Sequence, residues 1–354
     1  MRLTDLPVPL DLAPMEAKLV DEPPQGPGWR YEPKWDGFRC LAFRAGNEVA
    51  LKAKSGKPLA RYFPDVVATL QALPMDRFVV DGELVIEVDG VSSFEALQLR
   101  LHPAESRVRR LAAANPAGLV LFDCLLDGKG RSLVDAPFTT RRAELETWRR
   151  RFAEARAIRL SPGTHDRREA CAWLEAVGDA LDGVVAKRLD GPYAAGERAM
   201  MKIKHMRTAD CVVGGFRYAQ DGGGVGSLLL GLYDEAARLN HVGFTSTIPH
   251  AERPALTRKL ERLAGGVGFT GDAPGGPSRW STERSSEWTP LEPELVVEVR
   301  YDHVTGGRFR HGAKLLRWRP DKSPRQCTQA QLRAEASPSR LSQALKAADG
   351  GAPS

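Results

Sequence analysis

The pattern of hydrophobic residues changes near Arg207. Before this point, short apolar runs alternate with segments of helical periodicity, as in an α+β domain built on an antiparallel sheet. After it, short apolar runs are separated by turns, which is typical of a small β-barrel. Because 354 residues are also too many for one compact core, we predict two domains, residues 1–207 and 208–327, and a flexible tail, residues 328–354.

The expected elements follow from runs of Val, Leu and Phe bounded by Gly, Pro or Asp, and from amphipathic segments. Thr140 is expected to cap the longest amphipathic segment. A stretch rich in Gly, Pro and Ser over residues 265–286 is typical of a long surface loop. The predicted strands are 78–88, 118–126, 182–189, 211–219, 227–234, 235–239, 240–248 and 294–302, and the predicted helices are 62–74, 93–101, 139–155 and 252–264.

Charge and cysteine content narrow the class of protein. A formal net charge of +6 and a pI near 9.1 favour an acidic partner such as a phosphate backbone, and a merely solvated basic surface is the alternative. No apolar run approaches the roughly 20 residues of a membrane span, and the N-terminus lacks the apolar stretch of a signal peptide. We therefore expect a cytoplasmic protein that does not bind membranes. The five cysteines form no Cys-x-x-Cys pair, which argues against a zinc site or a disulfide framework.

The segment Glu32–Arg39 holds the first candidate for chemistry, Lys34, between a proline and a tryptophan. A lysine attacks phosphorus only as the free amine, so a nucleophilic lysine needs burial or cationic neighbours that lower its pKa. Asp36 could orient this amine or a sugar hydroxyl, and Gly37 would let the backbone approach a nucleotide. The alternative is an Asp-Gly turn beside a surface lysine.

Two carboxylates in expected strands are candidates for binding a ligand. Glu83 lies inside a strand, where a carboxylate is unfavourable unless it is exposed or paired, so it could contact a ribose or a metal. Asp182 begins another strand and could help to hold a divalent cation. A hairpin edge or a turn would explain both residues without a ligand. Phe122, in a third apolar strand, could offer its ring to a base or lie buried in the core.

Basic residues follow in two places. Lys187 could contact phosphate, and Lys202 and Lys204 would point to the same face of a strand because side chains alternate. Two such close charges favour an anion between them, and solvated lysines on an edge strand are the alternative. A basic cluster around Trp318 could hold a pyrophosphate or a duplex backbone, or simply be solvated. It contains Arg310, Lys314, Arg317, Arg319, Asp321 and Lys322.

The order of these segments resembles the motif series of the covalent nucleotidyltransferase superfamily. Lys-x-Asp-Gly, Asp-Gly-Glu, Phe-Asp, Asp-Gly-Val-Val-x-Lys, Lys-x-Lys and Arg-Trp-Arg-Pro-Asp-Lys follow one another, and the resemblance spans residues 10–326. Within the superfamily the chain looks like the ATP-dependent DNA ligases of the small, stand-alone bacterial ligase C type. The resemblance implies an α+β fold with an antiparallel-sheet, ATP-grasp-like nucleotidyltransferase domain followed by an OB-fold.

The resemblance also implies a role for each candidate residue. Lys34 would be the nucleophile that becomes linked to AMP, and Glu32 would read the adenine, on which Phe122 stacks. Glu83 and Asp182 would take the sugar and metal positions. The other implied nucleotide contacts are Asp36, Gly37, Arg39, Lys54, Lys187, Lys202 and Lys204, and the implied pyrophosphate or DNA contacts are Arg317, Arg319, Asp321 and Lys322.

The chain departs from the family pattern at two positions. The family usually has Glu where this chain has Asp182, whose side chain is one methylene shorter, so a metal there would be held through water. The usual Ser-Arg-x-Gly segment is replaced by Ala-Lys-Ser-Gly at residues 53–56. Lys54 keeps the positive charge there but lacks the bidentate fork of arginine.

The function that the resemblance implies is sealing of nicks with a 5′-phosphate and a 3′-hydroxyl in duplex DNA. The expected cofactors are ATP and Mg²⁺ or Mn²⁺. The protein would be a monomer that acts on nicked or broken duplexes in DNA repair. It would work at the bacterial nucleoid, beside other repair proteins. An RNA ligase or a capping guanylyltransferase would share the lysine chemistry and differ in base or acceptor. A non-catalytic DNA-binding barrel would explain the charge but not the ordered motifs. The NAD-dependent ligases carry a four-cysteine zinc module, which these scattered cysteines cannot supply.

Overall fold

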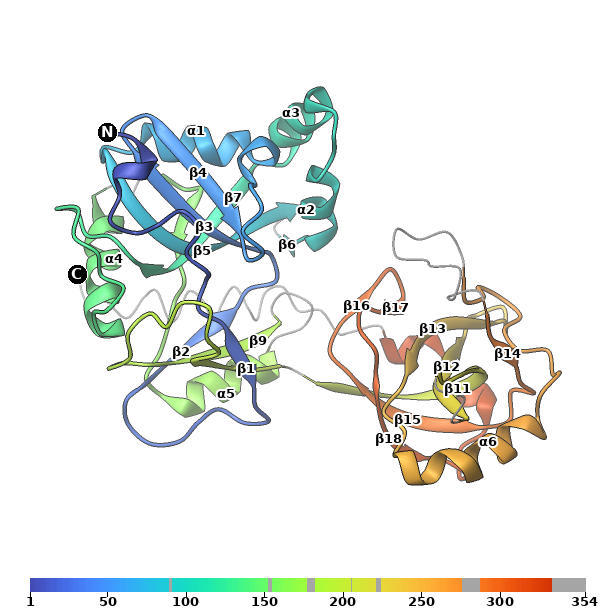
Figure 1. Cartoon of the computed structure of the whole chain (residues 1–354). Helices are drawn as coiled ribbons and strands as arrows, with labels where there is room; N and C mark the ends of the chain where they lie inside the picture. Colours follow the sequence, from blue (N-terminus) through green and yellow to red (C-terminus); the bar gives the residue numbers. More distant parts are fainter. Residues whose placement is uncertain are drawn as a thin grey trace. The chain divides into compact units, whose positions relative to one another are not determined.

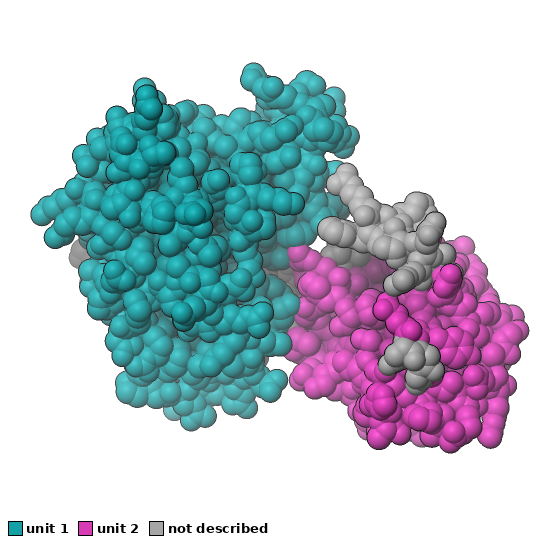
Figure 2. Space-filling view, in the orientation of Figure 1, with its two compact units in different colours: residues 1–204, 336–354 teal, residues 205–335 magenta. Residues whose placement is uncertain are grey.

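The chain forms two compact units in a computed structural model, which describes residues 1–88, 91–151, 155–176, 182–204, 206–220, 224–275 and 287–332 (Figures 1 and 2). Among these residues the first unit ends at Lys204 and the second begins at Met206. The boundary predicted from the sequence is near Arg207, and the independence of the two domains stays a prediction. None of the helices described is long and apolar enough to span a membrane.

A small sheet forms one half of the first unit, with the strand order β1-β10-β9-β2 (Figure 1). One of its faces packs on α5 through an apolar cluster that includes Tyr31, Trp173, Val184 and Ile203. Because side chains alternate along a strand, the residues next to these point to the opposite face. The elements are β1 (Ala17–Leu19), β2 (Trp29–Lys34), β9 (Gly183–Arg188), β10 (Met200–Ile203) and α5 (Arg167–Ala176).

A larger sheet forms the other half of the first unit, with the order β4-β3-β5-β7-β8, and β6 pairs with β5. Strand β5 lies between β3 and β7, so Glu83 is in a central strand and not at a hairpin edge. Helices α1 and α4 bury Leu70 and Trp148 in the core of this half. The elements are β3 (Phe38–Ala45), β4 (Glu48–Ala53), α1 (Pro64–Ala72), β5 (Arg77–Val88), β6 (Val91–Ser92), α2 (Phe94–Arg100), α3 (Glu105–Ala114), β7 (Ala117–Cys124), α4 (Phe138–Arg150) and β8 (Ile158–Leu160).

Helix α4 begins earlier than its sequence indicates. Thr140 was the expected cap, but the helix starts at Phe138 after Pro137, so that prediction is wrong. The reason is tertiary, because the amides of Phe138 and Thr139 donate to the carbonyl oxygens of Gly191 and Leu189 at 2.9 and 3.0 Å. Backbone from a distant loop thus satisfies donors that a side-chain cap would otherwise serve. Residues 152–154 of the predicted helix lie outside the described residues.

The second unit is built on one sheet with the order β13-β12-β11-β15-β18, and β14 pairs with β11. Helix α6 packs Leu256 and Leu260 against it. The edge strands of this sheet are β13 and β18. No ladder joins these two among the strands described, so closure into a barrel is not observed. The elements are β11 (Arg207–Tyr218), β12 (Val225–Tyr233), β13 (Leu239–Thr245), α6 (Arg253–Glu261), β14 (Thr289–Pro290), β15 (Val296–Tyr301), β16 (Val304–Thr305), β17 (Arg308–Phe309) and β18 (Lys314–Trp318).

Three segments of the second unit differ from their predicted structure or are described only in part. Of residues 235–239, predicted as a short strand, 235–238 lie in the turn between β12 and β13, where Ala237 has a φ of 57°, and Leu239 is the first residue of β13. Of the predicted loop 265–286, residues 276–286 lie outside the described part of the chain. Of the predicted tail, Gln329–Leu332 form a 3-10 helix and Leu332 is buried in the core, whereas residues 333–354 are not described.

A buried ion pair ties α4 to β7. Arg141 and Asp123 are each about 1% exposed, and the guanidinium donates to the carboxylate at 2.7 and 3.1 Å. The same guanidinium donates to the carbonyl oxygens of Ala136 and Gly191 at 2.6 and 3.0 Å. The pair therefore holds the loop around Gly191 as well as the helix.

We expect Arg141→Met to lower the free energy of unfolding of the first unit by about 3–5 kcal/mol, because it leaves the Asp123 carboxylate buried without its cation. Urea unfolding followed by tryptophan fluorescence measures this loss. Arg109→Met is the control, since the Arg109–Glu105 pair is 74% and 71% exposed and its removal should cost less than about 1 kcal/mol. Equal losses in the two variants would contradict the structural role of the buried pair.

Candidate active site

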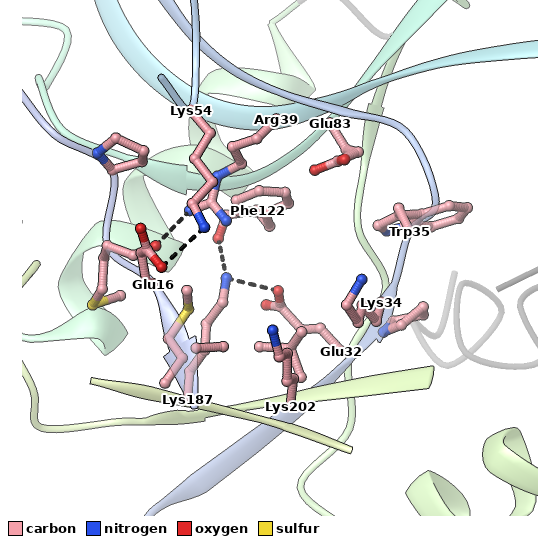
Figure 3. A pocket seen from close by; sticks show the side chains of 16 residues that line it. Glu16, Glu32, Lys34, Trp35, Arg39, Lys54, Glu83, Phe122, Lys187 and Lys202 are labelled. Carbon is pink, nitrogen blue, oxygen red and sulfur yellow. Dashed lines mark hydrogen bonds and ion pairs between the residues drawn. The ribbon is translucent and has the colours of Figure 1, made fainter. Parts of the chain in front are cut away.

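An open pocket of about 210 Å³ lies in the first unit, between the small sheet and the larger one. Figure 3 shows Lys34, Lys202 and Glu32 on one side of it and Arg39, Glu83 and Phe122 on the other. Lys54 and Lys187 complete the predicted site residues that line this pocket. Four predicted site residues of the first unit lie outside the lining: Asp36, Gly37, Asp182 and Lys204.

The register of the small sheet brings Glu32, Lys34 and Lys202 to the same side of the pocket. Glu32 and Lys202 are both partners of Val185, so these three side chains form a row across β2, β9 and β10. Directly opposed residues of antiparallel strands share a face, and this face is the one turned away from α5. Lys34 stands two residues further along β2, opposite Gly183. The pocket floor is therefore one face of a single sheet.

Lys34 is surrounded by charged groups. Its ammonium group is hydrogen-bonded to the carboxylate of Asp182, which also lies 3.8 Å from the Nζ atom of Lys204. Burial lowers the pKa of Lys202, and the positive charges of Lys34, Lys204 and Lys54 lower it further. Lys34, Lys202 and Lys204 thus gather around the Asp182 carboxylate at the edge of the pocket. This arrangement is suited to binding an anion.

Two glycines allow this close packing. Gly183 has a φ of 134°, and a Cβ atom there would lie 1.9 Å from the carbonyl oxygen of Ile203 in β10. A Cβ atom at Gly37 would lie 2.1 Å from the carbonyl oxygen of Leu84 in β5. Gly37 is thus needed for the approach of another strand, and its predicted contact with a nucleotide stays a prediction.

Glu32 and Lys187 form a buried pair beneath the pocket. Their side chains are 2% and 4% exposed and their charged atoms lie 2.8 Å apart, while Lys187 also donates to the carbonyl oxygen of Phe122 at 3.0 Å. Burial lowers the pKa of Lys187. Arg30 and Arg142 lie 3.4 and 3.5 Å from the other carboxylate oxygen, Oε1, which accepts no hydrogen bond from the residues described. Lys187, predicted as a phosphate contact, is thus engaged with Glu32.

Arg39 and Phe122 form the opposite wall. Arg39 donates from Nε and Nη2 to the buried carboxylate of Asp81, each at 2.6 Å. Its guanidinium and the ammonium of Lys187 each lie 4.6 Å from the centre of the Phe122 ring. Stacking of Phe122 on a base stays a prediction.

Glu83 adds a carboxyl group to this wall. Burial raises its pKa to about 7, and the positive charges of Arg39 and Lys34 offset part of this effect. Near neutral pH the group is therefore close to half ionised, unlike an ordinary surface glutamate.

Half of the residues that line the pocket were not predicted from the sequence. Met15 and Glu16 reach the pocket because β1 pairs in parallel with β10, and no local pattern indicates this pairing. Glu16 accepts a hydrogen bond from Lys54 at 2.9 Å, which lowers the pKa of Glu16. Trp35 could have been predicted, because an aromatic residue directly after Lys34 is a candidate for the pocket wall. The complete set of missed residues is Pro14, Met15, Glu16, Ala17, Pro33, Trp35, Val185 and Met200.

Acidic residues hold part of the basic cluster of the second unit, and two of them, Asp210 and Glu298, were not predicted from the sequence. Asp210 accepts hydrogen bonds from Arg319 at 2.9 Å and from Lys322 at 2.5 Å. Arg319 also binds Asp321, and this hydrogen bond lowers the pKa of Asp321 to about 2. Arg317 donates to Glu298 at 2.6 Å. Arg317, Arg319 and Lys322 thus belong to an ion-paired network and are not loose solvated cations.

Comparison with known proteins finds matches to both units. Residues 14–204 match the family described as the ATP dependent DNA ligase domain, and residues 221–322 match the ATP dependent DNA ligase C terminal region. DNA ligase C2 of Mycolicibacterium smegmatis is 47% identical over 93% of this chain and 96% of its own length. DNA ligase C of Mycobacterium tuberculosis is 44% identical, over 92% and 95%. A solved Lig E DNA ligase is 16% identical with a TM-score of 0.53, and covers 86% of this chain and 99% of its own.

The mixed α+β first unit with its lysine-lined pocket defines a nucleotidyltransferase-like enzyme, and the Lig E likeness agrees in fold. The two family matches and the two ligase C relatives then make the assignment specific. The chain belongs to the ATP-dependent DNA ligase family. The predicted resemblance to bacterial ligase C is confirmed, and so is the prediction that the chain is a DNA ligase that uses ATP.

The raised pKa of Glu83 predicts a pH-dependent effect of Glu83→Gln. Between about pH 4.5 and 7, Glu83 is protonated in the folded chain but ionised in the unfolded chain. The contribution of Glu83 to the free energy of unfolding is therefore complete below pH 4.5 and is lost as the pH rises through 7. Since glutamine stays neutral, the melting temperature of Glu83→Gln should rise relative to the parent between pH 5.5 and 8.5.

Glu87→Gln, at the exposed end of the same strand, is the control for that measurement. Its melting temperature should keep a constant difference from the parent over the same range. A constant difference for Glu83→Gln as well would show that the pocket does not perturb this carboxyl group.

Proposed function

We propose that this chain seals 5′-phosphate/3′-hydroxyl nicks in duplex DNA through an AMP group carried on Lys34. The observation that carries the proposal is the place of Lys34, at the end of β2 beside Lys202 and at the edge of a pocket with a buried carboxylate, Glu32, in its floor. Such a pocket offers a nucleophile, cations for phosphate and an acceptor for a base in one cavity.

In the first step the Nζ atom of Lys34 attacks the α-phosphorus of ATP. A nitrogen–phosphorus bond forms, the bond from that phosphorus to the bridging oxygen breaks, and pyrophosphate leaves. Lys34 has to lose a proton, and the Asp182 carboxylate bonded to its ammonium group is the nearest acceptor that the structure offers. Lys202 and Lys204 stabilise the charge that develops on the phosphate oxygens.

Recognition of the base falls to the floor of the pocket. The Glu32 carboxylate in the pocket floor can accept the exocyclic amine of adenine, whereas guanine presents an oxygen at that position. Phe122 and Glu83 also line this pocket, and we assign Phe122 to stacking on the base and Glu83 to accepting from a ribose hydroxyl. Arg39, Lys54 and Asp36 remain proposed nucleotide contacts. Lys187 would act on the nucleotide indirectly, through its ion pair with Glu32.

Mg²⁺ or Mn²⁺ fits this site as an ion that arrives with ATP. The residues described contain no group of three potential ligands, but Mg²⁺ in nucleotide sites is commonly held by one or two carboxylates and the substrate phosphates. Glu83 and Asp182 are the carboxylates that would hold it. The ion would supply charge neutralisation at the phosphates.

The remaining steps pass AMP to the DNA 5′-phosphate and then release it when the 3′-hydroxyl attacks. We assign the second domain, residues 208–327, to an OB-fold whose Arg317, Arg319, Asp321 and Lys322 contact pyrophosphate or DNA. The mycobacterial LigD proteins, 33% identical over 84% of this chain, are named for non-homologous end joining, which supports a place in DNA repair. We further propose a monomer that works in the cytoplasm at the nucleoid.

Incubation with α-labelled ATP and Mg²⁺ or Mn²⁺, followed by denaturing electrophoresis, tests this function. We expect a labelled protein band that disappears in Lys34→Ala and persists in Lys129→Ala, the exposed control. Addition of nicked DNA to the labelled protein should move the label to the DNA and then to free AMP. Labelling of Lys34→Ala equal to the parent would contradict the proposal.

The same assay separates the alternatives. Equal labelling by GTP would favour a guanylyltransferase, and transfer of label to nicked RNA but not to nicked DNA would favour an RNA ligase.

A further inference from the structure

A closed ring of hydrogen bonds joins four residues behind the pocket wall. Asp81 accepts from Arg39 at 2.6 Å and from the hydroxyl of Tyr193 at 2.5 Å. The Tyr193 hydroxyl in turn accepts from the amide of Met15 at 3.1 Å, and the carbonyl oxygen of Met15 accepts from Arg39 at 3.2 Å. Each residue thus touches two others of the ring.

Two members of this ring, Arg39 and Met15, line the pocket, whereas Asp81 and Tyr193 do not. Asp81 is fully buried and Tyr193 is 2% exposed. Burial beside Asp81 raises the pKa of Tyr193 well above its ordinary value, so the hydroxyl keeps its proton and remains a donor. The two buried residues therefore act on a ligand only through their neighbours.

The ring determines which part of Arg39 is free. Its Nε and Nη2 atoms are used by Asp81 and Met15, and its Nη1 atom makes no hydrogen bond to the described part of the chain. Because the guanidinium is planar and is held by two of its nitrogens, the direction of the third is determined as well. Met15 also precedes Glu16, the partner of Lys54 across the pocket.

Tyr193 itself is fixed from the opposite side. Its amide donates to the carbonyl oxygen of Val134 at 2.8 Å, and the nearby carbonyl of Gly191 accepts from Arg141 and from the amide of Phe138. The loop between β9 and β10 is thus anchored to α4. Tyr193, which belongs to this loop, can in turn restrict the movement of the pocket wall at Met15 and Arg39.

We propose that Tyr193 is a positioning residue for ATP: its hydroxyl holds Arg39 and the wall at Met15 in the geometry that receives the nucleotide. The inference rests on the proposed function, because it takes ATP as the ligand of this pocket. A purely structural tyrosine would stabilise the fold without changing how ATP binds.

Single-turnover labelling of Lys34 at increasing ATP concentrations distinguishes these roles. Tyr193→Phe removes the hydroxyl alone. We expect the ATP concentration at half-maximal rate to rise roughly fivefold to tenfold, which is the effect of one lost hydrogen bond, while the rate at saturating ATP changes less than about twofold. Tyr31→Phe is the matched control, since Tyr31 is 1% exposed and its hydroxyl donates to the carbonyl of Pro24 at 2.6 Å, away from the ring. It should lose thermal stability without a change in ATP dependence.

A double-mutant cycle with Arg39→Lys tests whether the effect passes through Arg39. Tyr193→Phe should raise the half-maximal ATP concentration much less in the Arg39→Lys background than in the parent. An unchanged ATP dependence in Tyr193→Phe, or an equal change in Tyr31→Phe, would overturn the inference while the parent still becomes labelled. A parent chain that takes no label would instead refute the proposed function.

Discussion

The antiparallel pairing of β2 with β9 determines the geometry of the pocket. It places Lys34 opposite Gly183 and Glu32 opposite Val185, and the pairing of β9 with β10 adds Lys202 to the same row. A slip of one residue would turn these charged side chains toward α5 and the apolar residues toward the pocket. The register is therefore specified by the apolar face, and the reactive face follows from it.

Three buried ion pairs lie around the pocket and keep their members fixed. Glu32 is held by Lys187, Arg39 by Asp81, and Asp123 by Arg141. Removing a charged group from water is costly unless a partner and further hydrogen bonds compensate, so each pair constrains the orientation of its members. The site is consequently arranged before a nucleotide enters, and binding has fewer side chains to order.

The sequence predicted what local patterns and residue order encode. Strands β5, β7 and β9 follow from apolar runs, and Lys34, Glu83 and Lys202 from the motif series. It did not predict contacts that depend on distant pairing. Thr140 looks like a cap, yet carbonyls at Gly191 and Leu189 begin the helix earlier. Glu16, Tyr193 and Asp210 carry no motif, because their roles arise only when β1 meets β10, a loop meets β5, or β11 meets the basic cluster.

The central claim is that Lys34 is the residue that carries AMP. Protein incubated with ATP and Mg²⁺, digested and sequenced by mass spectrometry, tests it directly. The account predicts one modified peptide, with the mass of AMP attached to Lys34 and lost after nicked DNA is added. AMP on Lys202, Lys204 or another lysine, with Lys34 unmodified, would contradict it.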